Sequence, residues 1–350
     1  MTERGKALWI LAFLSPIIAE MLSSSSPPFE FFFPLSLALL VGLYGAGALI
    51  IRELAVIWNR GWVSIIVMGA AYGILEEGVS VKSFFDPNWM DLGGLGVYGR
   101  YLGTNWVWAV WLMIFHSAVS ITLAIFILYL IYPHLKDVRF LTRKRFELVF
   151  AILFLDVLAC TTLLNPYVPL MPMYILAIFA VFALTFYARH IPKGFMMPPH
   201  PLPTWSPRRF AVLGFVFLFS SFFVSGLFVK TTVPFLVPIA LLLAISGATL
   251  LFIKEKVGAS GNQPQKAYFG AGILCFFIFL GFVVALGGVV DMYISVVLAT
   301  LFVLDLTRWS KGKKVLIFRV GRFIYGDAKP RPTGASTAEK RWRRRTGSNR

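Results

Sequence analysis

Long apolar runs separated by short polar segments recur along the whole chain. Most runs hold about 18 or more residues, enough for a helix rising 1.5 Å per residue to cross a hydrocarbon core of roughly 30 Å. They lack the alternation of apolar and polar residues that marks the strands of a membrane barrel. The pattern therefore predicts an all-α protein, a polytopic bundle of transmembrane helices.

The runs predict about ten spans within a transmembrane helical domain that covers residues 1–307. The expected spans are 7–22, 32–58, 62–82, 105–132, 147–165, 171–188, 210–229, 232–253, 267–286 and 289–306. Interior charge is concentrated in the spans within 1–165, whereas the spans within 210–306 are almost wholly apolar. Because ionisable groups are costly in hydrocarbon, any chemistry should lie in the first five spans.

Composition supports the membrane prediction. Of the 350 residues, 58% are hydrophobic and 14% charged, and the mean hydropathy is +0.77, more apolar than a water-soluble domain can cover with polar surface. Both cysteines, Cys160 and Cys275, lie in apolar runs. Neither a disulfide framework nor a cysteine metal site is therefore expected.

The distribution of loop charge predicts the orientation. With the N-terminus in the cytoplasm, 29 of the 33 Lys and Arg residues fall on the cytoplasmic side, as the positive-inside rule requires. We therefore expect a multi-pass protein of the cell membrane with both termini in the cytoplasm. Residues 308–350 should form a basic, partly disordered tail that lies against anionic lipids, and nucleic acid is not an expected partner.

Two adjacent glutamates, Glu76 and Glu77, stand inside the third span. Gly69 and Gly73 precede them by about two turns and one turn of the helix, respectively, on the same side, and such small residues let another helix approach closely. Both carboxylates should therefore face protein rather than lipid. Since adjacent buried charges of one sign repel, either one glutamate holds a proton or the two share a cation.

Further ionisable residues reach a similar depth when residues are counted at 1.5 Å each. They are Glu20 in the first span, His116 in the fourth and Asp156 in the fifth, and the cations expected near them are Lys82 and Arg100. We expect one acid-rich polar layer, which would attract protons or a metal ion.

The candidate catalytic residues of this layer are Glu76, Glu77 and His116. The candidate ligands of a divalent metal such as zinc are Glu77, His116 and Asp156. Each of these residues could instead hydrogen-bond to a neighbouring helix and only fix its packing.

Two other polar features are interpreted as structural. The Arg52-Glu53 pair at the end of the second span predicts a helix-locking ion pair whose arginine extends toward the cytoplasm. The loop 83–103 contains a Gly-x-Gly-x-x-Gly match that begins at Gly94, but no strand precedes it and no Rossmann helix follows, so the match is ascribed to chance. This loop could cover the polar layer like a lid.

The Glu76-Glu77 pair, followed by Phe115-His116 on the next span, resembles the CAAX-protease and bacteriocin-processing (CPBP) family of intramembrane proteases. The resemblance implies an all-helical core in which one glutamate is the general base and His116 binds a metal or orients the oxyanion. The sequence departs from that family at Val81, where the family has arginine, and in lacking a second histidine within a span. The stretch 72–108 is also similar to uncharacterised prokaryotic membrane proteins.

Three functions remain open at this point. The first is an intramembrane hydrolase acting on a membrane-embedded peptide or a lipid-linked substrate. The second is a proton- or cation-coupled transporter, because a buried acidic layer suits ion coupling equally well. The third is a membrane scaffold whose polar residues only lock the helices together.

Overall fold

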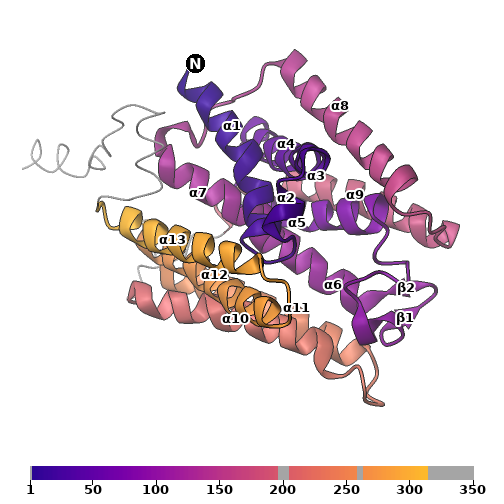
Figure 1. The fold of residues 1–350 in the computed structure, drawn as a ribbon. Coiled ribbons are helices and arrows are strands. Elements are labelled where there is room, and N and C mark those ends of the chain that lie inside the picture. Colours follow the sequence, from indigo (N-terminus) through magenta and orange to yellow (C-terminus); the bar gives the residue numbers. More distant parts are fainter. Residues whose placement is uncertain (1, 196–204, 258–262, 314–350) are drawn as a thin grey trace, which may run out of the picture.

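The computed structural model describes residues 2–195, 205–257 and 263–313 of the chain. These residues form a bundle of helices with one small β-hairpin (Figure 1). Residues 314–350 of the predicted tail lie outside the described residues. The all-α prediction is confirmed.

The helices follow one another along the chain with short connections. The first part contains α1 (Glu3–Pro16), α2 (Pro28–Phe31), α3 (Pro34–Leu40), α4 (Ala46–Ile57), α5 (Trp62–Gly73) and the 3-10 turn η4 (Gly93–Gly96). The middle part contains the antiparallel strands β1 (Arg100–Tyr101) and β2 (Thr104–Asn105), then α6 (Trp106–Phe115), α7 (Ala124–Ile131), the 3-10 turn η6 (Pro133–Leu135), α8 (Arg143–Ala159) and α9 (Met171–His190). The last part contains α10 (Pro207–Leu227), α11 (Leu236–Val257), α12 (Gln263–Leu286) and α13 (Met292–Ser310).

Several helices pass without a break into a π-helical segment, in which the hydrogen bonds span five residues instead of four. These segments are η1 (Ile17–Met21) after α1, η2 (Val41–Gly45) between α3 and α4, η3 (Ile74–Ser80) after α5, η5 (His116–Leu123) between α6 and α7, and η7 (Cys160–Leu164) after α8. π-Helical turns are rare and are found frequently at functional sites.

Nine helices within the described residues are long and apolar enough to cross a membrane. They are Pro34–Ile57, Trp62–Ser80, Trp106–Ile131, Arg143–Leu164, Met171–His190, Pro207–Leu227, Leu236–Lys256, Pro264–Leu286 and Met292–Ser310. They correspond to nine of the ten predicted spans. The first predicted span, 7–22, is not among them, because Arg4, Lys6 and Glu20 raise the charge of the helix formed by α1 and η1.

The helix formed by α1 and η1 nevertheless extends from one end of the bundle to the other. At its start, Glu3 pairs with His134 of the α7–α8 loop, at 3.0 Å between Oε2 and Nε2. Just beyond its end, the amide of Phe29 donates to Asp291 in the α12–α13 turn, at 3.2 Å. The last turn of α13 bonds to the last residues of α7, so Asp291 lies at the opposite end of the bundle from His134. The start of α1 and the end of α13 therefore lie on the same side of the bundle.

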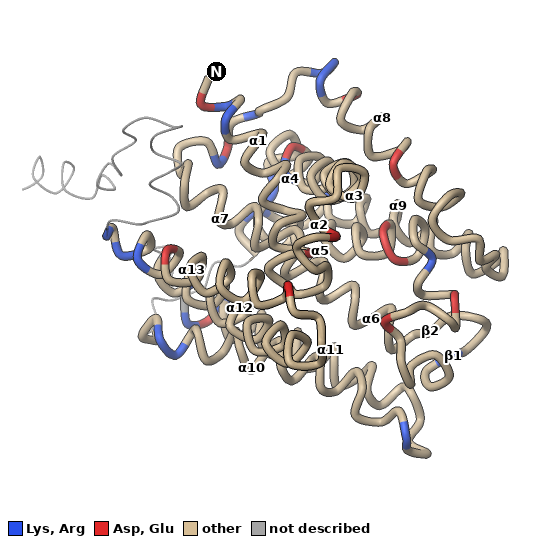
Figure 2. Tube along the Cα trace, viewed as in Figure 1, with Lys and Arg blue, Asp and Glu red and all other residues tan. Residues whose placement is uncertain are grey.

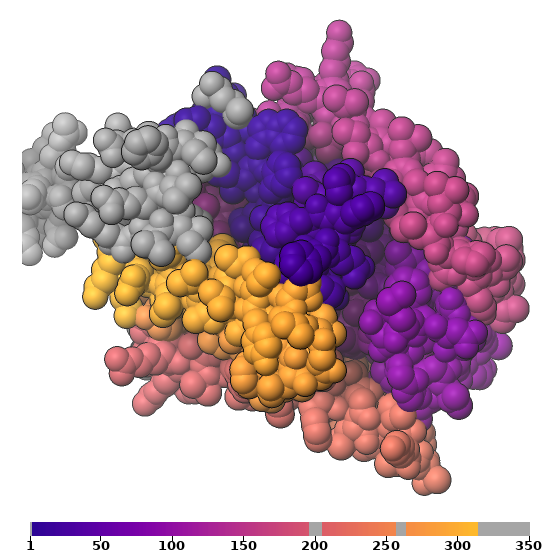
Figure 3. Space-filling model, in the orientation of Figure 1, coloured from indigo at the N-terminus to yellow at the C-terminus, as the bar shows by residue number. Residues whose placement is uncertain are grey.

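The helices divide into a central group and a flanking group (Figure 1; Figure 3). Helices α1 to α7 form the middle of the bundle, α10 to α13 pack together along one side, α9 packs against α5, and α8 lies at the margin. The outer helices expose many large apolar side chains, such as Phe179 and Phe182 on α9, which suits contact with lipid tails. Figure 2 shows that most Lys and Arg residues lie near helix ends, many on the side shared by the N-terminus and the end of α13.

The Arg52-Glu53 pair is fully buried and ties α4 to the α7–α8 loop. The two side chains are 2.5 Å apart, and the Arg52 guanidinium also donates to the carbonyls of Leu135 and Val138, at 2.6 and 2.5 Å. The guanidinium lies 3.5 Å from the ring centre of Phe140. Arg52 therefore extends toward the side that loop charge predicts to be cytoplasmic, but it binds loop carbonyls inside the protein instead of reaching solvent.

Candidate metal centre

The glutamates and the histidine come from two helices that pack at unusually short distance. Glu76 and Glu77 lie in η3, which continues α5, and His116 begins η5, which continues α6. A Cβ atom added to Gly69 would lie 2.8 Å from the Cα of Ser117, and one added to Gly73 would lie 3.1 Å from the Cα of Met113. A side chain at Gly69 would collide with the backbone of Ser117, and one at Gly73 would crowd that of Met113, so the predicted close approach along the small-residue row is confirmed.

This close packing brings Glu76, Glu77 and His116 into contact. The imidazole lies between the two carboxylates, with Nδ1 3.2 Å from Glu76 Oε2 and Nε2 3.2 Å from Glu77 Oε1. Nδ1 also lies 3.1 Å from the hydroxyl of Ser120, one helical turn further along η5. Glu76 is 4% and His116 1% exposed, whereas the Glu77 side chain is 13% exposed. The centre is therefore buried, with Glu77 at its most accessible edge.

A tyrosine that the sequence reasoning missed links the centre to a third glutamate. The hydroxyl of Tyr44 contacts both Glu20 Oε1 and Glu76 Oε1. A tyrosine hydroxyl has one hydrogen to donate, so the second of these contacts requires a proton on one of the carboxyl groups. A tyrosine in the middle of an apolar span needs a partner for its hydroxyl, and this requirement is the signal that could have identified Tyr44.

Each of the five π-helical segments in the described part of the chain carries a polar side chain that lies in the centre or beside it. These residues are Glu20 in η1, Tyr44 in η2, Glu76 and Glu77 in η3, His116 in η5 and Cys160 in η7. A π turn rotates the side chains that follow it relative to an α-helix, so it can turn a polar group inward that would otherwise face another direction. Five such turns around one centre support a functional role for this centre.

The two cations that the sequence placed near the acidic layer do not neutralise it. The Lys82 ammonium donates to the carbonyls of Thr161, Asn165 and Tyr167, at 2.9, 2.5 and 2.9 Å. Arg100 donates to backbone carbonyls of its own loop. Within the part of the chain that the structure describes, no Lys or Arg forms an ion pair with Glu20, Glu76 or Glu77. The centre therefore has an excess of acidic groups over basic ones.

Asp156 does not join the other candidate ligands. Its carboxylate, on α8, accepts from Cys160 Sγ of η7 at 3.7 Å and faces Gly42, where a side chain would collide with it. Among the described residues, the group whose ligand atoms all lie within 4.8 Å of one another comprises Glu76, Glu77 and His116 alone. The depth of Asp156 thus predicted correctly that it lies near the centre. Its position around the axis of α8, however, directs its side chain beside the centre and not into it.

The first residue of the loop 83–103 contacts the accessible edge of the centre. Ser83 donates to Glu77 Oε2, and the indole of Trp108 donates to the Ser83 hydroxyl at 3.1 Å. Burial, followed by the negative charge of Glu77, raises the pKa of the Asp91 carboxyl above its ordinary value. The glycine motif in this loop forms a short turn before the β1–β2 hairpin, so no dinucleotide fold accompanies it.

The arrangement can hold either a metal ion or shared protons. Carboxylate oxygens and an imidazole nitrogen are ordinary zinc ligands, and three protein ligands leave a fourth position for water. Glu76 Oε2 has no aligned hydrogen-bond donor among the described residues, although it is buried. A buried carboxylate oxygen without a donor is costly, so a cation or a proton at this position would stabilise the centre.

Apolar helices that enclose such a centre define the class of the molecule, which is an integral, polytopic membrane protein. The chain belongs to an uncharacterized membrane protein family, whose family model matches residues 9–323. No curated protein and no solved structure matches the chain. The expected similarity to uncharacterised membrane proteins is thus supported, whereas the resemblance to CPBP proteases gains no support from the family match.

Proposed function

We propose that Glu76, Glu77 and His116 bind a divalent metal ion and that the protein is an intramembrane hydrolase. The observation that carries this proposal is the buried contact of an imidazole with two carboxylates that no Lys or Arg neutralises among the described residues. Ligands of one zinc ion at 2.0–2.2 Å lie roughly 3.4 Å apart, so small side-chain movements would complete the site.

The surrounding hydrogen bonds suit this role. If His116 Nδ1 donates to Ser120, the lone pair of Nε2 is free to bind a metal, and metal-binding histidines usually have such an outer partner. Tyr44 holds Glu76 from the opposite side. These contacts would fix two ligands before the metal arrives.

Glu77 would serve both as a ligand and as the general base, because its carboxylate has two oxygens and is the most exposed of the three groups, so that one oxygen can bind the metal while the other accepts a proton. A bound divalent ion would lower the pKa of a water molecule and polarise a carbonyl group. Glu77 would accept a proton from that water, whose oxygen adds to the carbonyl carbon of the scissile bond. The same proton would then pass to the leaving group, so the glutamate returns to its starting form.

The test is the metal content of purified protein. Wild-type protein in detergent should contain about one equivalent of metal, His116→Ala should lose it, and Glu77→Gln should bind it at least tenfold more weakly. His134→Ala is the matched control, because this exposed histidine pairs with Glu3 far from the centre. A metal-free wild type whose variants only unfold earlier would favour the scaffold instead.

The hydrolytic step needs its own assay. A transmembrane peptide that carries a fluorophore and a quencher should be cleaved in proteoliposomes by the wild type and by His134→Ala. Glu77→Gln should leave it intact, since glutamine cannot accept the proton. Metal binding without cleavage of peptides or of lipid-linked esters would contradict the hydrolase.

One observation favours proton-coupled transport as a second candidate. Contacts run without a gap from Glu20 through Tyr44, Glu76 and His116 to Glu77. Glu20 and Glu77 at the two ends are partly exposed, whereas the middle groups are buried. A chain of this kind can pass protons, so Tyr44→Phe should stop proton flux into proteoliposomes if the protein is a transporter, and a wild type without such flux would contradict this second candidate.

A further inference from the structure

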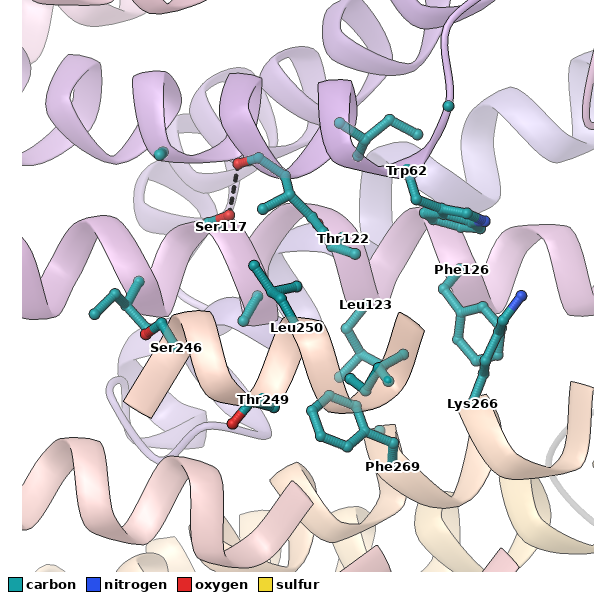
Figure 4. A pocket seen from close by; sticks show the side chains of 18 of the residues that line it. Trp62, Ser117, Thr122, Leu123, Phe126, Ser246, Thr249, Leu250, Lys266 and Phe269 are labelled. Carbon is teal, nitrogen blue, oxygen red and sulfur yellow. Dashed lines mark hydrogen bonds between the residues drawn. The ribbon is translucent and has the colours of Figure 1, made fainter. Parts of the chain in front are cut away.

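A large cavity separates the central helices from the flanking group. It has a volume of about 560 Å³, within the range of about 300–1,000 Å³ that is usual for ligand pockets. Its walls come from α5, η5 and α7 on one side and from α10, α11 and α12 on the other. Figure 4 shows apolar side chains such as Leu123, Leu250 and Phe269 around it, with the hydroxyl groups of Ser246 and Thr249 among them.

This cavity is distinct from the Glu-His centre. Ser117 lines the cavity, but the neighbouring His116 and both glutamates do not. The Ser117 hydroxyl donates to the carbonyl of Ile66 at 2.6 Å, which closes the contact between η5 and α5. The two sites therefore lie on different sides of the same helix pair.

One end of the cavity is strongly basic. The charged residues that line it are Arg60, Lys136, Asp137, Lys193, Lys254 and Lys266. They belong to the side of the bundle that holds His134, the side that loop charge predicts to be cytoplasmic. Five cations and one acid thus surround the opening.

Most of this positive charge lacks an acidic partner. Lys193 pairs with Asp137 at 3.0 Å. Lys136 lies 6.0 Å from the ring centre of Trp62, and Lys254 lies 4.9 Å from that of Phe195. Among the described residues, neither of these lysines pairs with a carboxylate, and Lys266 does not either. Clustered cations that face an apolar chamber favour an anionic ligand with an apolar part.

A small second cavity shows where the anion would lie. It has a volume of about 50 Å³ and shares Trp62, Tyr129, Lys136 and Lys266 with the large one. Figure 4 shows the Lys266 amine extending beside Phe126 toward Trp62. Two lysines and three aromatic side chains, those of Trp62, Phe126 and Tyr129, thus border a polar recess next to the apolar chamber.

We propose that this cavity binds an anionic phospholipid, with an acyl chain in the apolar chamber and the phosphate between Lys136 and Lys266. The bilayer supplies such a molecule at the depth of the opening, and basic side chains near the membrane surface attract anionic headgroups. A soluble anion would use the lysines but not the chamber. This inference does not depend on the metal centre or on hydrolysis.

The experiment measures the binding of fluorescent phosphatidic acid and of fluorescent phosphatidylcholine to the purified full chain in detergent. The wild type should bind phosphatidic acid at least tenfold more tightly, and the double variant Lys136→Gln/Lys266→Gln should lose this preference. Lys144→Gln is the matched control, because this lysine is exposed at the start of α8 on the same side of the bundle. Equal affinity for the two lipids in the wild type would overturn the proposal.

A second variant tests the chamber separately. Ser246 lines the cavity from α11, so Ser246→Phe should block the acyl chain and weaken phosphatidic acid binding at least tenfold. Competition with glycerol 3-phosphate distinguishes the two parts of the ligand, since the lipid should bind far more tightly than this headgroup alone. Headgroup binding as tight as lipid binding, or an unaffected Ser246→Phe variant, would contradict the lipid site.

Discussion

Replacing Arg52 tests whether the buried ion pair holds α4 to the α7–α8 loop. In Arg52→Met, the protein loses the contact with Glu53 and the two hydrogen bonds to loop carbonyls. Breaking a buried pair from one side costs about 3–5 kcal/mol, because the remaining charge stays buried without its partner. Arg139 lies 3.9 Å from Glu53 and can replace part of the lost charge. We therefore expect the lower end, about 3 kcal/mol.

The assay is unfolding in mixed micelles with increasing sodium dodecyl sulfate, followed by tryptophan fluorescence. Arg143→Met is the matched control, since Arg143 pairs with Glu147 at 2.9 Å but both side chains are mostly exposed, and it should change the free energy of unfolding little. Adding Glu53→Gln to Arg52→Met should recover more than about 1 kcal/mol, because the unpaired charge is then removed.

If Arg52→Met costs less than about 1 kcal/mol, or no more than the exposed control, then burial does not decide the strength of the pair. A double variant less stable than Arg52→Met would show that Glu53 is stabilised by its backbone donors, the amides of Phe140 and Leu141, without help from arginine.

Three further changes test other parts of the structure. Lys82→Met should lower the free energy of unfolding by about 3 kcal/mol, because three backbone carbonyls lose a charged donor, and an unchanged value would contradict that contact. Gly69→Val should force α5 from η5 and lower both the thermal midpoint and the metal content, whereas Gly247→Val, which meets open space, should change neither. Reporter fusions should place Gly94 outside and Asp137 inside the cell, and the reverse result would overturn the predicted orientation.

Hydropathy alone was sufficient to predict the membrane helices, because the cost of placing a residue in hydrocarbon is a local property of that residue. Nine of the predicted spans correspond to helices of the required length and apolarity, and α13 ends at Ser310, close to the predicted domain end at 307. The first predicted span is the exception. Its charged residues make the helix formed by α1 and η1 less apolar than the other spans, although this helix also extends across the bundle.

Part of the centre was also accessible from the sequence. Gly69 and Gly73 mark the face along which another helix approaches, so the spacing predicted that Glu76 and Glu77 face protein. Depth counting then placed His116 within roughly two helical turns of them, and the structure brings the three side chains together. Both arguments depend only on the rise and the turn of one helix at a time.

What the tertiary structure decided is the direction of side chains around each helix and the pairing of distant segments. Asp156 has the right depth but points beside the centre, and Tyr44 joins it from a span with no other candidate residue. The π-helical turns rotate these groups in a way that a regular period of 3.6 residues does not predict. The basic cavity likewise combines residues from segments as distant as Arg60 and Lys266, and only packing brings such segments to one opening.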